Sequence, residues 1–463
     1  MSVVAARASI SEALAGIVGA SAVANDATLE SYSIDGIVPA AMVAPGSVEQ
    51  VAEILRFANA ERLTLVPAGG FTQQDIGRTP GRVDIVLSTA RLNGVEHYDP
   101  GDLTLGVAAG TTLAQLDAVL AANAQFLPID AMLPERATIG GVLATAANGP
   151  LKHGYGGVRD FCIGVSFVTA EGRIAKGGGR VVKNVAGYDL MKLMIGSHGT
   201  LGVIVRANFK VFPRPGGKSP TATFVLEFAS LKDATEFLAK LRGSALGPIC
   251  CELVSPRAAE YLRETPSVPR EVEEVEPGTF SIKSAEAGRA WRILVRATGS
   301  EAVLGRYGRE LGGREVRGAE ETELWRNISN FQVAVTSRHQ NAMLMHVNLP
   351  PASVQKAVVA AEKAGLDNNL FAPTVGRVAI GALVIAFVPL SVDPPSAMQF
   401  ASAASAFRAT LPRDASAVVV RCPKEAKSHF DVWGSSPTDL AAMRAVKRAL
   451  DPNNILNRGR FLV

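Results

Sequence analysis

The sequence predicts an α+β protein with two domains, the first of which is completed by the end of the chain. Up to about residue 215, short apolar strands alternate with amphipathic helices. Beyond that point a strand–helix–strand pattern occurs twice, which indicates a ferredoxin-like α/β domain built from two related halves. The last helix has strong end signals and is assigned back to the first domain. We therefore expect domains over residues 1–215 and 216–432, with residues 433–463 returning to the first.

Composition supports this division and argues against several classes of protein. The chain has 463 residues, of which 48% are hydrophobic and 19% charged, so it can form more than one buried core. Its formal net charge is only +4, and no run of five like charges suggests a nucleic-acid partner. The longest apolar run, residues 378–390, is shorter than the roughly 20 residues of a membrane helix, and the N-terminus is a poor secretory signal. We expect a cytoplasmic protein that meets the inner face of a membrane only through partners.

The elements of the first domain follow from hydrophobic periodicity. After an amphipathic N-terminal helix, a second helix begins at Ser47, with Gln50 in the position of a capping box. Two buried strands then flank a glycine-rich loop, and a further strand leads into a third helix. The ranges are 47–60 for the second helix, 63–67 and 83–88 for the two strands, 103–110 for the further strand, 112–122 for the third helix and 201–213 for a closing amphipathic strand.

The second domain and the tail are placed by the same signals. Each half consists of a strand, an amphipathic helix and a strand. The expected ranges are 223–228, 232–241 and 249–254 in the first half, and 342–349, 353–364 and 378–388 in the second. A Glu- and Pro-rich stretch over residues 263–278 is expected to be a mobile loop. In the tail, Ser436 is expected to cap a helix with Pro437 in its first turn, and Asp451-Pro452 to end it.

Glycine is abundant, with 44 residues, and three glycine-rich segments are the candidate site. Residues 66–77, VPAGGFTQQDIG, offer successive backbone N–H groups that could bind an anionic group, although an ordinary turn fits equally well. Residues 133–160 collect small side chains where a planar or phosphate-bearing ligand could lie, or where strands cross tightly. Residues 181–204 add polar groups, which are Lys183, Asn184, Tyr188 and His198.

Other common motifs are absent from the sequence. There is no G-x-G-x-x-G, which argues against a nicotinamide cofactor bound in the Rossmann manner. The four cysteines form no C-x-x-C, and the six histidines form neither H-x-H nor H-E-x-x-H. We therefore expect no metal and no iron–sulfur cluster in this chain.

The order of the glycine-rich motifs is similar to that of a known flavoprotein family. PAGGFTQQDIG, then ATIGG with YGGVRD, then KNVAGYDLMKLMIGSHGTLGVI and FPRP resemble the FAD-binding domain of the vanillyl-alcohol oxidase/p-cresol methylhydroxylase (PCMH-type) family. Within it, the resemblance is closest to the E subunits of glycolate oxidase. It covers residues 40–216 and, weakly, the tail DPNNILNRGRF. The resemblance implies a two-subdomain FAD-binding domain followed by a cap domain.

The resemblance also implies a set of FAD-binding residues. In that family the first loop wraps the pyrophosphate, the second segment approaches the flavin and the rest of the dinucleotide, and the closing strand adds main-chain contacts. The residues that match are Ala68, Gly69, Gly70, Phe71, Thr72, Gln74, Thr138, Gly140, Gly141, Thr145, Gly149, Tyr155, Gly202 and Ile204. Because Phe71 replaces the histidine of covalently flavinylated relatives, and no cysteine lies within the second segment, we expect noncovalent FAD.

The implied activity is oxidation of the CH–OH group of a small 2-hydroxyacid. Such a reaction needs a base near the hydroxyl and a cation for the carboxylate, and the candidates are His346, Arg326 and His429 in the second domain. Related D-2-hydroxyacid dehydrogenases hold a metal through histidines and a glutamate, and the H-x-H pattern of that site is missing here. Since the chain has no cluster ligands, the resemblance implies a D-type flavoprotein subunit and an iron–sulfur subunit as partners.

Two alternatives remain open at the level of sequence. The chain could be a free-standing flavin dehydrogenase for another alcohol or hydroxyacid, with a substrate pocket in its own cap. It could also be a noncatalytic scaffold subunit that holds FAD only for assembly.

Overall fold

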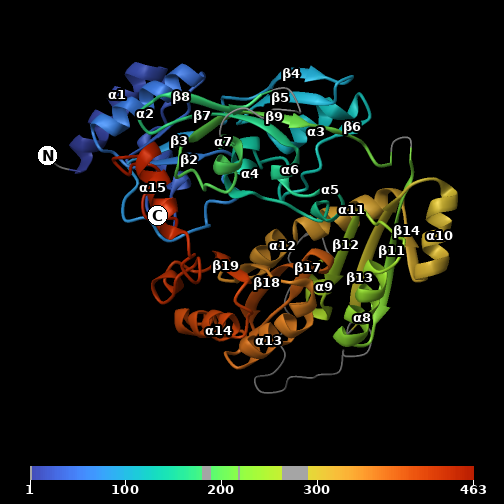
Figure 1. The fold of residues 1–463 in the computed structure, drawn as a ribbon. Helices are drawn as coiled ribbons and strands as arrows, with labels where there is room; N and C mark the ends of the chain where they lie inside the picture. Colours follow the sequence, from blue (N-terminus) through green and yellow to red (C-terminus); the bar gives the residue numbers. More distant parts are fainter. Residues whose placement is uncertain (1–2, 180–188, 217–218, 263–289) are drawn as a thin grey trace. The chain divides into compact units, whose positions relative to one another are not determined.

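The computed structural model describes residues 3–179, 189–216, 219–262 and 290–463 (Figure 1). The chain divides into two compact units. Unit 1 comprises Met1–Arg214 and Asp431–Val463, and unit 2 comprises Pro215–Phe430. The sequence placed the two boundaries at residues 215 and 432, close to these positions. The end of the chain lies in the same compact unit as its beginning.

The first part of unit 1 is a small parallel sheet with strand order β1-β3-β2, built from β1 (Ala41–Val43), β3 (Ile85–Ser88) and β2 (Leu65–Ala68). Helices α1 (Val3–Val18) and α2 (Val48–Ala60) contribute Leu14, Ile54 and Leu55 to its core. Helix α2 begins as expected, because the Ser47 hydroxyl accepts a hydrogen bond from Gln50 N. The Gln50 side chain, however, accepts from Gly46 N at 2.7 Å and not from the N-cap backbone, so only half of the expected capping box forms.

The second part of unit 1 is a five-stranded antiparallel sheet with strand order β4-β5-β9-β7-β8. Its helical cover shares a core with the sheet in which Phe161, Phe167 and Phe209 are fully buried. A short β10–β6 pair lies outside it. The elements are β4 (Val95–Asp99), β5 (Thr104–Ala108), α3 (Leu113–Ala121), β6 (Gln125–Phe126), α4 (Ile139–Thr145), α5 (Lys152–Tyr155), α6 (Val158–Phe161), β7 (Cys162–Val168), β8 (Ile174–Gly178), α7 (Leu190–Met194), β9 (Val203–Lys210) and β10 (Phe212–Pro213).

The C-terminal segment packs back onto unit 1 through helix α15 (Leu440–Leu450) and the residues after it. Lys447 is only 5% exposed, and its Nζ donates to Thr200 O at 2.8 Å and to Leu456 O at 3.0 Å. Nζ also pairs with Asp451 Oδ2 at 2.5 Å, and that carboxylate accepts from the N–H groups of Ile455 and Leu456. The helix, the tail and the turn before β9 are thus joined at one buried ion pair.

The expected start of this last helix was wrong. The sequence assigned Ser436 as the cap and Pro437 to the first turn, but α15 begins at Leu440, with Asp439 at the N-cap position and no side-chain cap. Residues before it form a turn in which Leu440 N donates to Pro437 O. The turn replaces the helical geometry that the Ser-Pro pair suggested. The expected end at Asp451 is correct.

Unit 2 contains one nine-stranded antiparallel sheet with the order β14-β11-β13-β12-β17-β18-β15-β19, and β16 pairs β18 beside this path. Strands β14-β11-β13-β12 form one ferredoxin-like half and β17-β18-β15-β19 the other, and β12–β17 pairing joins them. The strands are β11 (Thr221–Phe228), β12 (Cys250–Val254), β13 (Trp291–Thr298), β14 (Arg314–Val316), β15 (Met343–Asn348), β16 (Leu370–Phe371), β17 (Thr374–Arg377), β18 (Ala382–Pro389) and β19 (Ser416–Arg421).

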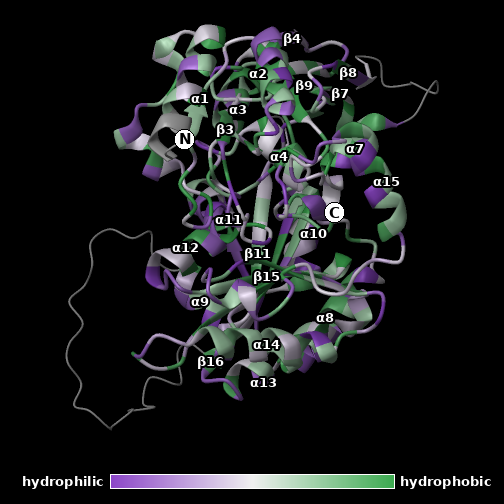
Figure 2. Ribbon diagram, turned by 90° about the vertical axis from the view of Figure 1, so that its left-hand side faces the viewer, coloured by the Kyte–Doolittle hydropathy of each residue, from purple (hydrophilic) through white to green (hydrophobic). Residues whose placement is uncertain are grey.

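The helices of unit 2 are amphipathic. Figure 2 shows purple and green residues mixed along α13 (Val354–Leu366) and α14 (Ala397–Ala409), and Val358, Phe400 and Phe407 are among their buried members. The other helices are α8 (Leu231–Arg242), α9 (Pro256–Leu262), α10 (Glu301–Leu311), α11 (Gly318–Ser329) and α12 (Phe331–Arg338). The expected strand–helix–strand pattern of both halves is present.

One expected strand of unit 2 is interrupted. Residues 378–388 were expected to form a single strand, but Val378–Ile380 form a 3-10 turn and β18 begins only at Ala382. Gly381 has φ +67°, and a Cβ there would lie 1.8 Å from Leu349 O, so the chain turns at a position that only glycine tolerates. The stretch 263–278, expected to be a loop, lies outside the described residues.

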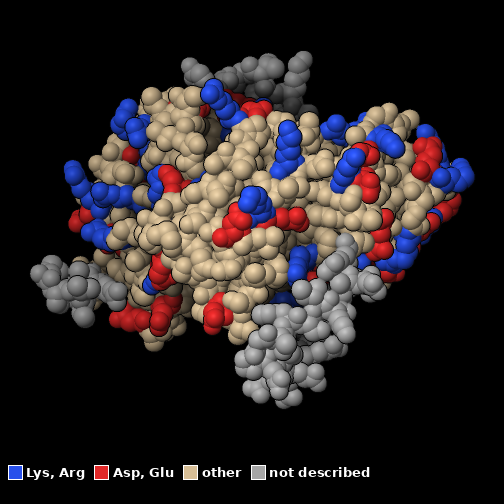
Figure 3. Space-filling model, turned by 90° about the horizontal axis from the view of Figure 1, so that it is seen from below, with Lys and Arg blue, Asp and Glu red and all other residues tan. Residues whose placement is uncertain are grey.

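Charge is dispersed over the surface that Figure 3 shows, where Lys and Arg alternate with Asp and Glu. Within the described parts of the chain, no helix is both long enough and apolar enough to span a bilayer.

Candidate cofactor site

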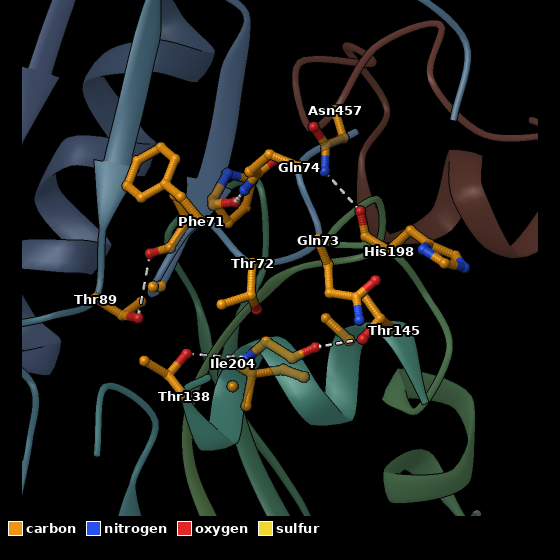
Figure 4. A pocket seen from close by; sticks show the side chains of 18 of the residues that line it. Phe71, Thr72, Gln73, Gln74, Thr89, Thr138, Thr145, His198, Ile204 and Asn457 are labelled. Carbon is orange, nitrogen blue, oxygen red and sulfur yellow. Dashed lines mark hydrogen bonds between the residues drawn. The ribbon is translucent and has the colours of Figure 1, made fainter. Parts of the chain in front are cut away.

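A pocket in unit 1 is lined by residues from all three glycine-rich segments and from the C-terminal tail (Figure 4). Its empty volume is about 740 Å³, part of which is open to solvent. The sequence-predicted cofactor residues that line it are Ala68, Gly69, Gly70, Phe71, Thr72, Gln74, Thr138, Gly140, Gly141, Thr145, Gly202 and Ile204. Residues separated by more than 130 positions in the chain thus meet at one cavity.

The loop after β2 presents unbonded backbone donors. Within the described residues, the N–H groups of the four residues from Gly70 to Gln73 donate no hydrogen bond. Phe71 has φ +58°, in the left-handed region, and such a residue within a turn aims successive N–H groups towards one side. Gln74 Nε2 holds the loop from within by donating to Pro67 O at 3.1 Å. This geometry suits an anion such as a pyrophosphate.

The paired glycines allow this loop to pack closely on the second segment. A Cβ at Gly69 would lie 2.0 Å from Thr138 Oγ1, and a Cβ at Gly70 would lie 1.7 Å from Arg136 O. Arg136 Nη2 also donates to Gly70 O at 3.0 Å. The sequence suggested that these glycines permit the approach of a ligand; in the structure they permit the approach of another part of the same chain.

The second segment enters the pocket as the short helix α4. Thr138 is its N-cap, and the hydroxyl accepts from Gly141 N at 3.4 Å, while Thr145 Oγ1 donates to Gly141 O at 2.8 Å. A Cβ at Gly140 would lie 3.0 Å from Ala109 Cβ, so this glycine keeps α4 against the end of β5. Small side chains therefore keep this wall of the pocket close to the backbone.

The third segment supplies a turn and the start of β9. Gly202 and Ile204 line the pocket, whereas the His198 ring packs 4.9 Å from the Trp433 ring and 5.1 Å from the Phe461 ring, measured between centroids. Burial, with a smaller effect of the Arg460 charge, lowers the pKa of His198 to about 4, so this ring is neutral at pH 7. Three other polar candidates of this segment, Lys183, Asn184 and Tyr188, lie outside the described residues.

Two predicted cofactor residues do not line this pocket. A Cβ at Gly149 would lie 2.3 Å from Asp130 O, so Gly149 permits a close contact with the chain just before its own segment. The Tyr155 ring lies edge-on to the rings of Phe126 and Phe212, with centroids 5.3 and 5.4 Å away. Their assignment as FAD-binding residues therefore stays a prediction.

The sequence interpretation missed the contribution of the tail to the pocket. Asn457 and Arg460 line it, and Asn457 Nδ2 donates to His198 O at 2.6 Å (Figure 4). The motif DPNNILNRGRF was noticed only as a weak resemblance, and no local pattern in it points to a ligand. The further lining residues are Pro67, Gln73, Ile76, Thr89, Ala144, His198, Gly199 and Val203.

The candidate catalytic residues all lie in unit 2 and do not line this pocket. His346 on β15 is half-buried, its Nε2 lies 3.1 Å from Gln332 Oε1, and desolvation together with the Arg377 charge lowers its pKa to about 4. Arg326 on α11 pairs with Glu323, and His429 is exposed at the end of a 3-10 turn. Among the described residues, no group of three or more His, Cys, Asp or Glu could hold a metal ion.

Family models match two stretches of the chain, which lie almost entirely in unit 1. Residues 39–178 match the FAD binding domain, and residues 427–461 match the C-terminal domain of FAD linked oxidases. The first stretch includes two of the glycine-rich pocket segments, and the second includes the pocket residues of the tail.

Known proteins with similar sequences are 2-hydroxyacid dehydrogenases and oxidase subunits by name. The chain is 27% identical to a D-2-hydroxyglutarate dehydrogenase of Xanthomonas citri pv. viticola, over 91% of this chain and 89% of that enzyme. It is 38% identical to glycolate oxidase subunit GlcE of Escherichia coli, but over only 34% of this chain and 45% of that subunit. A closest relationship to glycolate oxidase E subunits is therefore not established.

The fold matches that of p-cresol methylhydroxylase. The crystal structure of that enzyme with substrate bound superimposes with a TM-score of 0.75, at 18% identity, over 98% of this chain and 96% of that one. The chain therefore has a PCMH-type FAD-binding fold. Together with the family models, these matches identify it as a flavoprotein that uses FAD and as an FAD-dependent oxidoreductase.

Proposed function

We propose that this chain oxidises the CH–OH group of a small D-2-hydroxyacid, with FAD held noncovalently in the pocket of unit 1. The observation that carries the proposal is the convergence of the three glycine-rich segments and the tail on one cavity whose loop offers unbonded N–H groups. Similarity to a D-2-hydroxyglutarate dehydrogenase along 91% of the chain supports the choice of substrate class.

The pocket residues divide into two roles in this proposal. The N–H groups of residues 70–73 hold the pyrophosphate, and the small residues of α4 and the start of β9 leave room for the rest of the dinucleotide. Among the described residues that line the pocket there is no cysteine, and the ring of the one histidine, His198, packs against aromatic rings. Noncovalent binding is consistent with this lining.

The chemistry requires proton handling and charge recognition by the protein. Bound FAD supplies a two-electron acceptor for the hydride from the substrate carbon. In our proposal His346, neutral at pH 7, accepts the hydroxyl proton, and Arg326 binds the substrate carboxylate in exchange for its present partner Glu323. His429, which is exposed, is the alternative base.

We also propose that the chain works beside a D-type flavoprotein subunit and an iron–sulfur subunit, which carry the electrons onward. The 38% identity to GlcE over part of the chain supports this assembly. A free-standing dehydrogenase is the second candidate, and the match along nearly the whole length of a D-2-hydroxyglutarate dehydrogenase favours it.

Reduction of the bound flavin tests the activity. The chain is purified alone, and with the two partners where its genome encodes them, and glycolate, D-lactate and D-2-hydroxyglutarate are added without oxygen. Bleaching of the flavin by the isolated chain, followed by turnover with a dye acceptor, supports a free-standing enzyme. Bleaching only in the complex supports a subunit role. Flavin that no hydroxyacid reduces in either form indicates a scaffold and contradicts the proposed activity.

A further inference from the structure

The C-terminal tail lies against the strand that carries the loop of the pocket. Leu65 N donates to Ile455 O at 2.8 Å, and Asn457 N donates to Leu65 O at 2.9 Å, so the tail pairs with the beginning of β2. Asn457 Nδ2 then reaches His198 O in the third segment. This pairing places the next turn of the tail, which ends at Arg460, beside residues 74–78.

Arg460 is buried in the wall of the pocket and fastens the loop. It is 5% exposed, and Nη1 donates to Gln74 Oε1 at 2.9 Å while Nη2 donates to Ile76 O at 2.7 Å and also to Gln74 O. The carbonyl of Arg460 accepts from Arg78 N at 2.9 Å and from Trp433 Nε1 at 2.9 Å. Nε is buried without a hydrogen-bond partner among the described residues.

The hydrogen-bond acceptors of this guanidinium are neutral. They are carbonyl oxygens and amide side chains, and the carboxylates that act on Arg460 electrostatically are those of Asp35 and Asp75. Burial outweighs these two carboxylates and lowers the pKa of Arg460. A buried positive charge is costly unless an anion compensates it. Arg460 lines the same cavity as the unbonded N–H groups of the loop, where an anion would lie.

We propose that Arg460, brought in by the C-terminal tail, is the positive charge that compensates the phosphates of FAD. It is a binding residue for the cofactor and a positioning residue for the loop. FAD binding and packing of the C-terminal tail then stabilise each other, because the phosphates compensate the buried Arg460 charge and that charge strengthens binding of the phosphates. This inference rests on the proposed location of FAD in the pocket of unit 1.

Titration of FAD into the full-length apoprotein tests the inference, with quenching of flavin fluorescence as the readout. Arg460→Gln removes the charge, and we expect its FAD dissociation constant to rise about tenfold or more. Arg460→Lys keeps the charge and is expected to bind FAD more tightly than Arg460→Gln. Arg458→Gln, at an exposed position of the same tail, is the matched control and leaves the affinity unchanged. The dissociation constant of the wild type rises with salt concentration, and this dependence is weaker in Arg460→Gln.

The outcomes separate a failure of this inference from a failure of the pocket assignment. Equal weakening in Arg460→Lys and Arg460→Gln, with unchanged salt dependence, would mean that the residue acts through packing alone, and the charge role is overturned. If Gly70→Ala weakens FAD binding and Arg460→Gln does not, only the role of Arg460 fails. If neither variant weakens binding, FAD lies elsewhere. If Arg460→Gln does not fold, as judged by thermal melting, the salt dependence of the FAD dissociation constant of Arg460→Lys decides. A salt dependence like that of the wild type supports the role of the charge, and a lost salt dependence contradicts it.

Discussion

Gly70 illustrates how one residue determines whether the pocket can form. A Cβ there would lie 1.7 Å from Arg136 O, a backbone atom that cannot rotate away. We expect Gly70→Ala to lower the free energy of unfolding by about 1–3 kcal/mol, as overpacking does, and to weaken FAD binding because the loop moves off the second segment. Urea denaturation and FAD titration measure the two effects. Gly81→Ala, where a Cβ would meet nothing within 4 Å, is the control and should change neither.

His198 predicts a pH dependence of stability. Its pKa is lowered from 6.5 to about 4 by burial, so between pH 4 and 6.5 the unfolded chain binds more protons at this residue than the folded chain does. The stability contribution is complete above pH 6.5 and is lost as the pH falls towards 4. His198→Phe keeps a ring beside Trp433 and Phe461 and should reduce the loss measured by urea denaturation at pH 7 and pH 4.5. An unchanged pH dependence in this variant would contradict the assignment.

Among single residues, the sequence predicted those of the pocket loop but missed the tail residues Asn457 and Arg460, which hold the loop in place. The motif PAGGFTQQDIG marked the residues around Phe71, because glycines and small polar residues after a strand have a recognisable pattern. Asn457 and Arg460 have no such pattern. Their role depends on contacts between distant parts of the chain, such as that between Arg460 and Gln74, which are more than 380 positions apart. Local periodicity cannot reveal such contacts. Gly149 was carried over from the family resemblance; it does not line the pocket, and a Cβ there would lie 2.3 Å from Asp130 O.

Helix α15 and the tail after it are an element whose stability depends on one buried ion pair. Lys447→Met removes the cation and leaves the Asp451 carboxylate buried, with the backbone N–H groups of Ile455 and Leu456 as its remaining donors among the described residues. We expect a loss of about 3–5 kcal/mol in the free energy of unfolding, as for other broken buried pairs. Arg448→Met, at the exposed neighbouring position of the same helix, should change it by less than about 0.5 kcal/mol. Similar effects for the two variants would refute the importance of the pair.

Elements with strong periodicity were predictable, and those that depend on distant contacts were less so. Helix α2 and strand β5 follow directly from their apolar spacing and capping residues. The predicted start of strand β18 was too early, because the apolar run gives no sign that the chain must turn at Gly381, next to Leu349 O. The start of α15 was misplaced because a Ser-Pro pair can open a turn as readily as a helix.

For the whole molecule, the division into two units could be anticipated because the order of strands and helices differs between the two regions of the sequence. The alternation in the first region and the twofold strand–helix–strand repeat in the second correspond to sheets of different construction. The pairing order of unit 2, in which β12 and β17 join the two halves, was not predictable, since strand order depends on contacts that the linear pattern does not encode.

We also expect FAD binding and folding of the chain to be thermodynamically linked. Because FAD binds only the folded chain, saturating FAD should raise the melting temperature of the apoprotein, and more so as its concentration increases. Differential scanning fluorimetry measures this shift. AMP, which lacks both the flavin and the pyrophosphate, serves as the control ligand and should produce a smaller shift. Equal shifts from both ligands would argue against a pyrophosphate site in the loop.

Whether this chain uses FAD to oxidise a D-2-hydroxyacid is decided by anaerobic reduction of its bound flavin. We expect D-2-hydroxyglutarate, D-lactate or glycolate to bleach the oxidised flavin spectrum, in the isolated chain or in its complex. Arg326→Gln should slow this bleaching at subsaturating substrate. A flavin that is bound but reduced by none of these acids, in either form, would rule out this activity.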